Sequence, residues 1–392
     1  MSIRNALRNR LKKNKIIKNI YENILFKPII NLYSDNFDKT CLLSYSVFPF
    51  KQKEKKLIHP NFVENYTLAD SLRKHKYNID VYNNSYNKKI DYSKYDLIIG
   101  EGLPISKYFL ESKNYKADTI YYATGSHPMV NNYRAKSSLL AFARKHNEYI
   151  ENSARIVPEL WSLGATLSNK YMILGNEVTK NTFDEFNNSE NKKILNPPFY
   201  ATNIIKDFSK KNNKEFLWFG SYSLIHKDLN TVLDVFINHP ELTLHICGRI
   251  EEEKEFINVY KKDLEKASNI KMHGYVNVDS EEFKKLMESC SFTILSSCAE
   301  GCSTAIATVM GNGGLIPIIS KECGLSIKNG SYVISGDYSS IENAVLKAAE
   351  YKLDNIVDDS KENIKFVNNE FSIDIFKKNV EAILDSFLVE CK

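Results

Sequence analysis

The chain has 392 residues, of which 43% are hydrophobic and 26% charged, and this length predicts two domains rather than one core. The net charge of +5 is concentrated at the amino terminus, where residues 1–30 hold eight Lys and Arg against one Glu. The rest of the chain is slightly acidic, which argues against a nucleic-acid-binding body, and no run of 18 apolar residues predicts a membrane-spanning helix.

Residues 1–36 are predicted to form a basic amphipathic helix. Apolar residues such as Ile3, Leu7 and Leu11 fall near one face, and basic residues surround them. Such a helix can lie on an anionic membrane surface. We therefore expect peripheral contact with the inner face of the cell membrane through residues 1–30. The alternative is a solvated helix that packs against its own domain.

The seven cysteines indicate a reducing cellular compartment rather than a metal-binding site. They include no CxxC pair and no His/Cys spacing typical of a metal centre. Several lie in apolar runs and fit small core residues. We expect a cytoplasmic protein with no metal and no other cofactor.

Strands and helices alternate along the first half of the chain. Apolar runs predict strands at residues 40–48, 79–82, 96–100, 119–123 and 171–174. Helical spacing predicts helices at residues 61–75 and 136–152. Residues 194–199 contain Asn196, Pro197 and Pro198, and are predicted to form a linker.

The second half repeats the alternation. Strands are expected at residues 216–220, 242–248, 269–273, 292–295, 315–319 and 331–335. Helices are expected at residues 227–237, 251–266, 280–289, 339–350 and 373–388. Two such series predict an α/β protein with two Rossmann-like, doubly wound domains that face each other across a cleft. We place the first domain at residues 37–200 and the second at 201–365. Residues 366–392 form a last helix that could pack back on the first domain.

The turn after the strand at 292–295 contains the largest group of candidate ligand-binding residues. Glu300 can accept hydrogen bonds from hydroxyls, and Gly301 lets a ligand approach the backbone. Cys302, Ser303 and Thr304 are expected to present free N–H groups at the start of a helix that stops near Gly311. A carboxylate beside an anion site suits a ligand with hydroxyls and phosphates, such as a sugar nucleotide. The alternative is an ordinary acidic residue at a helix start.

The second series resembles the donor domain of the GT-B glycosyltransferases, and most closely the retaining glycosyltransferase family 4. The likeness covers residues 215–336 and rests on the order and spacing of six segments. These include Gly220 followed by Lys227, the strand ending ICG, the segment NIKMHGYV, and the Glu300–Gly301 turn. The resemblance implies a GT-B fold and a nucleotide-sugar donor.

The resemblance also implies a role for each matching residue. Lys227 would neutralise the diphosphate, and Glu300 would contact hydroxyls of the donor sugar. Lys227 could instead be an ordinary surface lysine, although a helix start is an unfavourable place for a cation. The other donor-binding candidates are Gly220, Ser221, Gly248, Arg249, Tyr275, Val276, Gly301, Cys302, Ser303, Thr304 and Thr308.

Two positions depart from the family pattern. Ser221 stands where an Arg commonly follows the glycine, and Thr308 stands where the family has a second Glu. Arg249 could supply the missing positive charge, or could be a solvated loop residue. Tyr275 and Val276 match the segment that contacts the base, or are core residues.

Polar residues at strand exits in the first domain are the acceptor-side candidates. His127 follows the strand at 119–123, and family members often place a His near the reacting end of the sugar. It could equally be a structural loop residue. Glu101 could orient the acceptor, or be a solvated loop acid. Gly102, Gly125 and Ser126 are expected at the same edge, with Gly175 and Asn176 as further rim residues.

These features predict a glycosyltransferase that moves a sugar from a nucleotide-sugar donor to a glycan or lipid-linked acceptor in cell-envelope polysaccharide synthesis. The sequence contains no Asp-x-Asp, so we expect a metal-independent reaction, and the resemblance to glycosyltransferase family 4 implies a retaining one. Glu300 and His127 would act as orienting and electrostatic groups. The alternatives are a nucleotide-sugar epimerase, and a non-catalytic partner or glycan-binding subunit whose donor site is degenerate at Ser221 and Thr308.

Overall fold

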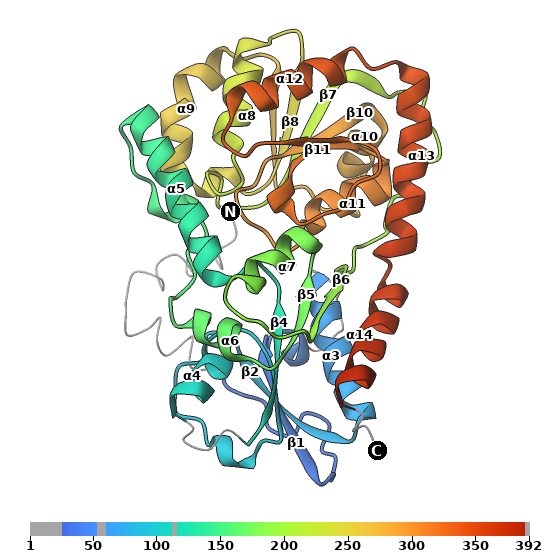
Figure 1. The fold of residues 1–392 in the computed structure, drawn as a ribbon. Helices are drawn as coiled ribbons and strands as arrows, with labels where there is room; N and C mark the ends of the chain where they lie inside the picture. Colours follow the sequence, from blue (N-terminus) through green and yellow to red (C-terminus); the bar gives the residue numbers. More distant parts are fainter. Residues whose placement is uncertain (1–25, 53–59, 112–115, 389–392) are drawn as a thin grey trace.

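A computed structural model describes residues 26–52, 60–111 and 116–388. These residues form two lobes, each built on a six-stranded parallel sheet (Figure 1). The sheet of the N lobe has the order β2-β1-β3-β4-β5-β6. Its strands are β1 (Lys39–Tyr45), β2 (Tyr77–Asn83), β3 (Leu97–Gly100), β4 (Asp118–Ala123), β5 (Lys170–Leu174) and β6 (Lys192–Leu195).

Helices connect the strands of the N lobe, as parallel pairing requires. They are α3 (Pro60–Lys74), α4 (Leu103–Glu111), α5 (Pro128–His146), α6 (Trp161–Leu167) and α7 (Glu177–Asp184). Short 3-10 turns are η1 (Pro49–Lys51), η2 (Tyr92–Lys94) and η3 (Glu151–Ser153). The strands read as continuous apolar runs because helices cover both faces of the sheet.

The C lobe has the sheet order β12-β11-β10-β7-β8-β9. Its strands are β7 (Asn212–Phe219), β8 (Thr243–Cys247), β9 (Ile270–Gly274), β10 (Cys290–Leu295), β11 (Ile316–Ser320) and β12 (Ser331–Val333). Its helices are α8 (Leu229–Asn238), α9 (Lys254–Lys266), α10 (Glu281–Ser289), α11 (Thr304–Gly313), α12 (Tyr338–Ala349) and α13 (Leu353–Glu370), with 3-10 turns η4 (Ile250–Glu252) and η5 (Lys321–Cys323). The sheet order of each lobe reverses beside its first strand, which is the doubly wound pattern.

Two helices cross from one lobe to the other. Helix α5 follows a strand of the N lobe but lies along α9 and α8 of the C lobe (Figure 1). Its Leu139 and Phe142 belong to the core of the C lobe, and the ring of Phe142 stacks on Phe256 at 5.9 Å. At the other end of the chain, α14 (Ile373–Leu388) follows α13 and packs on α3 and β6 of the N lobe.

Several predicted elements have different bounds in the structure. The linker expected at residues 194–199 overlaps the end of β6, which pairs with β5. The helix expected at residues 136–152 begins at Pro128 and ends at His146. Helix α11 continues past Gly311 and ends at Gly313, and its C-cap Gly314 has a φ of +65°, which suits glycine.

The predicted amino-terminal helix lies mostly outside the described residues. Where its last residues are described, from residue 26, the chain is irregular, and Ile29 forms an antiparallel bridge with Val81. No described helix is long and apolar enough to cross a bilayer.

Candidate active site

Glu300 lies in the turn between β10 and α11, and neighbouring segments fix this turn from two sides. The Glu300 N–H donates to the Glu322 carbonyl at 2.9 Å. The ring Nε2 of His226 lies 2.6 Å from the Ala299 carbonyl, and the Ser297 hydroxyl donates to the His226 carbonyl at 3.2 Å. Burial lowers the pKa of His226 to about 4, so the ring is neutral and can donate through Nε2.

Both oxygens of the Glu300 carboxylate are bound by cations. Lys227 Nζ lies 2.5 Å from Oε1, and Arg155 Nη1 lies 3.1 Å from Oε2. The Ser297 hydroxyl oxygen, whose one hydrogen is shared with the His226 carbonyl, lies 3.0 Å from Oε1. Burial alone would raise the pKa of Glu300, but the charges of Arg155 and Lys227 outweigh it and hold that pKa well below its usual range. The carboxylate is therefore ionised throughout the physiological pH range.

Lys227 is a buried residue rather than the surface lysine of the alternative interpretation, with 7% of its side chain exposed. It precedes α8 instead of lying inside its first turn, because Asp228 is the N-cap of that helix. The Asp228 carboxylate accepts hydrogen bonds from the Ser296 hydroxyl and the Gly336 N–H, both at 2.7 Å. These bonds hold Lys227 beside the end of β10.

The start of α11 differs in part from the prediction. The Ser303 N–H is not free, because it donates to the Cys323 carbonyl at 2.9 Å. The N–H of Thr304 lies in the first turn, where a helix offers no internal partner. Burial raises the pKa of the Cys302 thiol, so this cysteine is not a thiolate. Thr308 turns its hydroxyl back to the Thr304 carbonyl at 2.7 Å and so does not replace the second family Glu.

The remaining donor-side candidates lie at the carboxyl ends of β7, β8 and β9. The Gly220 N–H donates to the Cys247 carbonyl, and the Gly248 N–H donates to the Gly274 carbonyl. A side chain at Gly248 would contact the backbone of Gly220 and Ser221, so the loops that follow β7 and β8 touch. The guanidinium of Arg249 lies 5.3 Å from the centre of the exposed Tyr275 ring, whereas Val276 is buried in the core.

The carboxyl end of the N-lobe sheet meets the Glu300 turn directly. The Thr179 hydroxyl on α7 donates to the Gly301 carbonyl at 2.7 Å. A Cβ atom on Gly301 would lie 2.4 Å from the Thr124 carbonyl oxygen, which follows β4. The two sheets thus point their carboxyl edges at each other, and Glu300 lies where the lobes touch.

Glu101 is buried at this same edge rather than solvated. Its carboxylate accepts a hydrogen bond from the Thr124 hydroxyl at 2.7 Å and one from the Asn84 amide at 3.1 Å. Burial raises the pKa of Glu101, although these two bonds lower it. Gly102 has a φ of +87°, and a Cβ there would meet the Asn84 carbonyl oxygen at 2.2 Å, so only glycine fits.

The other acceptor-side candidates flank Thr124 and α7. Gly125 has open space where a Cβ would stand, and the buried hydroxyl of Ser126 has no hydrogen-bond partner among the described residues. At the rim, a Cβ on Gly175 would meet the Gly301 carbonyl oxygen. Asn176 caps α7 and its amide lies 3.4 Å from the Ser326 hydroxyl of the C lobe.

His127 is fully buried inside the N lobe. Its Nδ1 accepts the Met129 N–H at the start of α5, and its ring stacks on Phe186 at 4.2 Å. Burial lowers the pKa of His127 to about 4, which keeps the ring neutral. This placement fits the structural interpretation of His127, and a contact with substrate stays a prediction.

Arg155 is the residue that the sequence analysis missed. It lies 145 positions before Glu300, in an irregular segment between η3 and α6. No motif or periodicity marks such a segment. The sequence analysis also missed Ser153 and Glu253, which hold the loop before Lys227.

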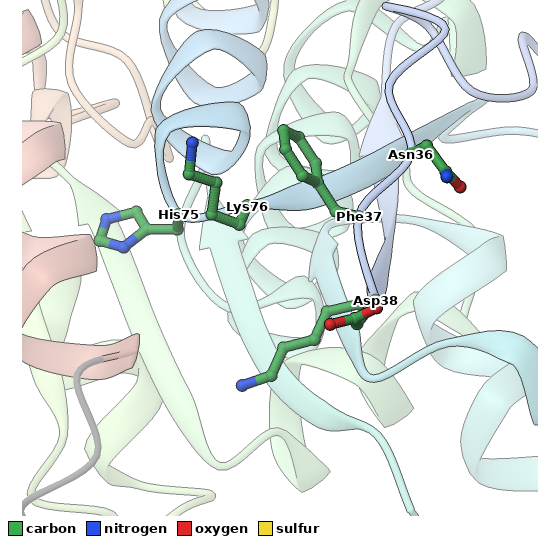
Figure 2. Close-up of a pocket in the computed structure, with 6 residues that line it drawn as sticks. Asn36, Phe37, Asp38, His75 and Lys76 are labelled. Atoms are coloured by element: carbon green, nitrogen blue, oxygen red, sulfur yellow. The ribbon is translucent and has the colours of Figure 1, made fainter.

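One surface pocket of about 410 Å³ lies away from this cluster (Figure 2). It is found where β1 and β2 begin, at the edge of the N-lobe sheet opposite to Glu101. The residues that line it are Asn36, Phe37, Asp38, Lys39, His75 and Lys76. Their side chains do not converge on one point in Figure 2, so we do not place the chemistry there.

Within residues 26–52, 60–111 and 116–388, no group of three or more His, Cys, Asp or Glu side chains is arranged to hold a metal ion.

Comparisons with known proteins concern the C-lobe sequence and the fold. The sequence model of a family described as glycosyl transferases group 1 matches residues 201–369, which include Lys227 and Glu300. The matched segment is less than half of the chain. A comparison of the sequence with curated proteins gave no match.

Solved structures of glycosyltransferases share the fold. Sucrose-phosphate synthase of Thermosynechococcus elongatus is 10% identical with a TM-score of 0.61, over 89% of this chain and 99% of that one. HepE of Anabaena, in complex with UDP-glucose, is 12% identical with a TM-score of 0.56, over 88% and 99% of the two chains. TarM of S. aureus is 13% identical with a TM-score of 0.49, over 73% of this chain and 54% of TarM, so this chain spans about half of that protein's length.

At these identities the likeness concerns the fold alone. Together with the two facing sheets, it confirms the predicted GT-B fold.

Proposed function

We propose that this protein is a glycosyltransferase that moves a sugar from a nucleotide-sugar donor to a hydroxyl of a glycan or lipid-linked acceptor in cell-envelope polysaccharide synthesis. The observation that carries the proposal is the cluster of the buried Lys227 and Glu300 with the partly exposed Arg155, at the meeting edge of the two sheets. Two of its three members lie in the segment that matches glycosyl transferases group 1. HepE, which shares the fold, was solved with UDP-glucose, a ligand of the proposed class.

The cluster suits a donor with a diphosphate and a sugar. Breaking the bond between the anomeric carbon and the diphosphate leaves negative charge on the phosphate oxygens. Lys227 and the N–H groups in the first turn of α11 would stabilise that charge without a metal. Glu300, once its cations turn to the phosphate, would accept hydrogen bonds from the sugar hydroxyls.

The reaction we propose retains the configuration at the anomeric carbon. The acceptor oxygen bonds to that carbon on the face that the diphosphate leaves, and its proton passes to a leaving phosphate oxygen. No covalent protein nucleophile is needed for this route. Glu101 would orient the acceptor hydroxyl from the N lobe, together with Thr124.

We place the protein in the cytoplasm, at the inner face of the membrane, through the basic residues 1–30. Deleting residues 1–30 should release it from vesicles that contain anionic lipid. Retention on those vesicles after the deletion would remove this part of the proposal.

A non-catalytic subunit with a degenerate donor site is the second candidate, because Thr308 is bonded to its own helix and offers no carboxylate. A nucleotide-sugar epimerase differs from both, since it would convert the donor without an acceptor.

A thermal-shift screen of the intact protein against UDP-, GDP-, ADP- and dTDP-sugars tests the proposal. One donor should raise the melting temperature, because it binds the native state alone. Lys227→Ala should abolish that rise, whereas Lys285→Ala, on the exposed face of α10, should keep it. No stabilisation by any nucleotide sugar would reject the transferase and the epimerase together.

A further inference from the structure

Residues 150–157, which we call the strap, belong to the N lobe by chain order but are bonded to the C lobe. The buried Ser153 is the anchor. Its carbonyl accepts the His226 N–H at 3.0 Å, and its hydroxyl accepts the Ile225 N–H at 3.1 Å. The strap is thus fixed to the loop that ends in Lys227.

Glu253 of the C lobe completes the attachment. Its carboxylate accepts the hydroxyl hydrogen of Ser153 and the N–H groups of Ser223 and Leu224. The strap, the loop at residues 220–227 and the start of α9 therefore form one hydrogen-bonded unit. These bonds fix the position of the strap relative to Lys227.

Arg155 is carried by this unit to the second oxygen of Glu300. Its Nη1 donates at 3.1 Å, while 41% of the side chain stays exposed, against 7% for Lys227. A guanidinium has five N–H donors, and Glu300 engages one nitrogen, so donors are left for another anion. A planar fork of this kind binds phosphate oxygens in pairs.

The charges of the cluster do not balance. At Glu300 two cations face one carboxylate, and the second cation, Arg155, keeps 41% of its side chain exposed. The N–H donors of Arg155 that Glu300 does not engage favour a further anion. A diphosphate is an anion of suitable charge and size, and it would reach Arg155 from the exposed side.

We propose that Arg155 is a donor-binding residue that holds the diphosphate together with Lys227, and that Ser153 positions it. The proposal rests on the proposed function. It places in the strap the positive contact that is missing at Ser221. The structural alternative is that Arg155 only joins the two lobes through Glu300.

The test compares a diphosphate with a monophosphate on the same protein. Calorimetric titration of the full chain with UDP and UMP, and in parallel GDP and GMP, gives an affinity ratio that does not depend on the folded fraction. Arg155→Gln should lower the affinity for the diphosphate by about tenfold or more, and that for the monophosphate much less. Arg155→Lys should recover part of the loss, because it restores charge without the fork.

Arg134→Gln is the matched control. Arg134 lies on α5 and faces Glu322 of the C lobe at 3.9 Å, so it also pairs across the lobes but does not touch Glu300. The proposal is overturned if Arg155→Gln leaves the ratio unchanged, or if Arg134→Gln lowers it equally. If the wild-type protein binds neither UDP nor GDP, the proposed function itself is rejected. That result differs from the two outcomes that overturn only the role of Arg155.

Discussion

Lys227 Nζ and Glu300 Oε1 lie 2.5 Å apart although 73 positions separate these residues in the sequence. One precedes the first helix of the C lobe, and the other follows the central strand β10. The pair forms because β7 and β10 are neighbours in the sheet, so their exit loops share one edge. Since both side chains are buried, neither charge is tolerated without the other.

Glu300→Gln should therefore lower both stability and transfer. The substitution keeps the shape of the side chain but leaves Lys227 without its counter-charge. We expect a loss of about 3 kcal/mol in the free energy of unfolding. This value is near the low end for a broken buried ion pair, because the second cation at Glu300, Arg155, is partly exposed to water. Urea unfolding at pH 7 measures this loss. A bound nucleoside diphosphate should restore part of it by returning negative charge.

The pH dependence of this effect has a defined sign. The cations hold the pKa of Glu300 well below its unfolded value, so the stabilisation is present above the unfolded pKa and is lost as the pH falls toward the folded pKa. The difference between wild type and Glu300→Gln should shrink in acid. Glu322→Gln removes the longer ion pair between Glu322 and Arg134, and should lower the free energy of unfolding much less than Glu300→Gln does. Equal losses in the two variants would contradict the central role of Glu300.

Much of the C lobe could be predicted because its strands are apolar runs with glycine or polar exits. Residues 292–295 fall within β10, and residues 373–388 match α14. Helix α13 was not predicted, since its first residues lack a side-chain cap and it follows α12 after a short break. The end of β6 was assigned to a linker because Asn196, Pro197 and Pro198 follow it directly, and prolines there are compatible with β6 because it lies at the edge of the sheet.

Site residues were predictable from the sequence only where they lie in a loop directly after a predicted strand. Lys227 and Glu300 were expected near one ligand, and the structure shows them in contact. Arg155 was beyond prediction, because its place depends on the bonds of Ser153 to a loop more than 70 residues away. The free N–H of Ser303 was wrongly predicted, since its acceptor, the Cys323 carbonyl, belongs to a turn after the next strand.

Glu64 on α3 provides a test that is independent of the donor site. Its Oε2 accepts hydrogen bonds from the hydroxyls of Tyr45 at 2.8 Å and Tyr122 at 2.9 Å. Burial raises the pKa of Glu64 to about 7. The folded state thus binds more protons than the unfolded state between pH 4.5 and 7, and stability falls as the pH rises through that window.

The glutamine side chain of Glu64→Gln is neutral at every pH, so the stability of this variant should not fall as the pH rises through that window. Relative to wild type it should gain about 3 kcal/mol in the free energy of unfolding between pH 5 and pH 8. Urea unfolding at both pH values measures the gain. Glu190→Gln, at an exposed position of the same lobe, should follow the wild-type profile. If the free energy of unfolding of Glu64→Gln changed with pH in parallel with that of wild type, ionisation of Glu64 would not destabilise the folded state.

His127→Ala should chiefly destabilise the N lobe. It removes the cap of α5 and the stack on Phe186, together worth about 2 kcal/mol. His127→Asn should lose less, because Asn can keep the cap. Turnover per folded molecule should stay close to wild type in both variants. A loss of turnover of about a hundredfold in His127→Asn, with the fold intact, would instead assign His127 to the substrate site.

Gly301→Ala tests whether the lobes must touch at the Glu300 turn. The added Cβ would lie 2.4 Å from the Thr124 carbonyl oxygen and 2.9 Å from the Gly125 nitrogen, so backbone must move on one side. That movement would stretch the bond from the Thr179 hydroxyl to the Gly301 carbonyl and separate Glu101 from the donor cluster. We expect a lower melting temperature, a larger radius of gyration by X-ray scattering, and about tenfold less transfer or lower, because a shift of about 1 Å already misplaces the acceptor. Gly125→Ala adds the same methyl group on the opposite side of the contact, where nothing lies within 4 Å, and should behave as wild type. If the two variants behave alike in all three measurements, the contact at Gly301 is not part of the working geometry.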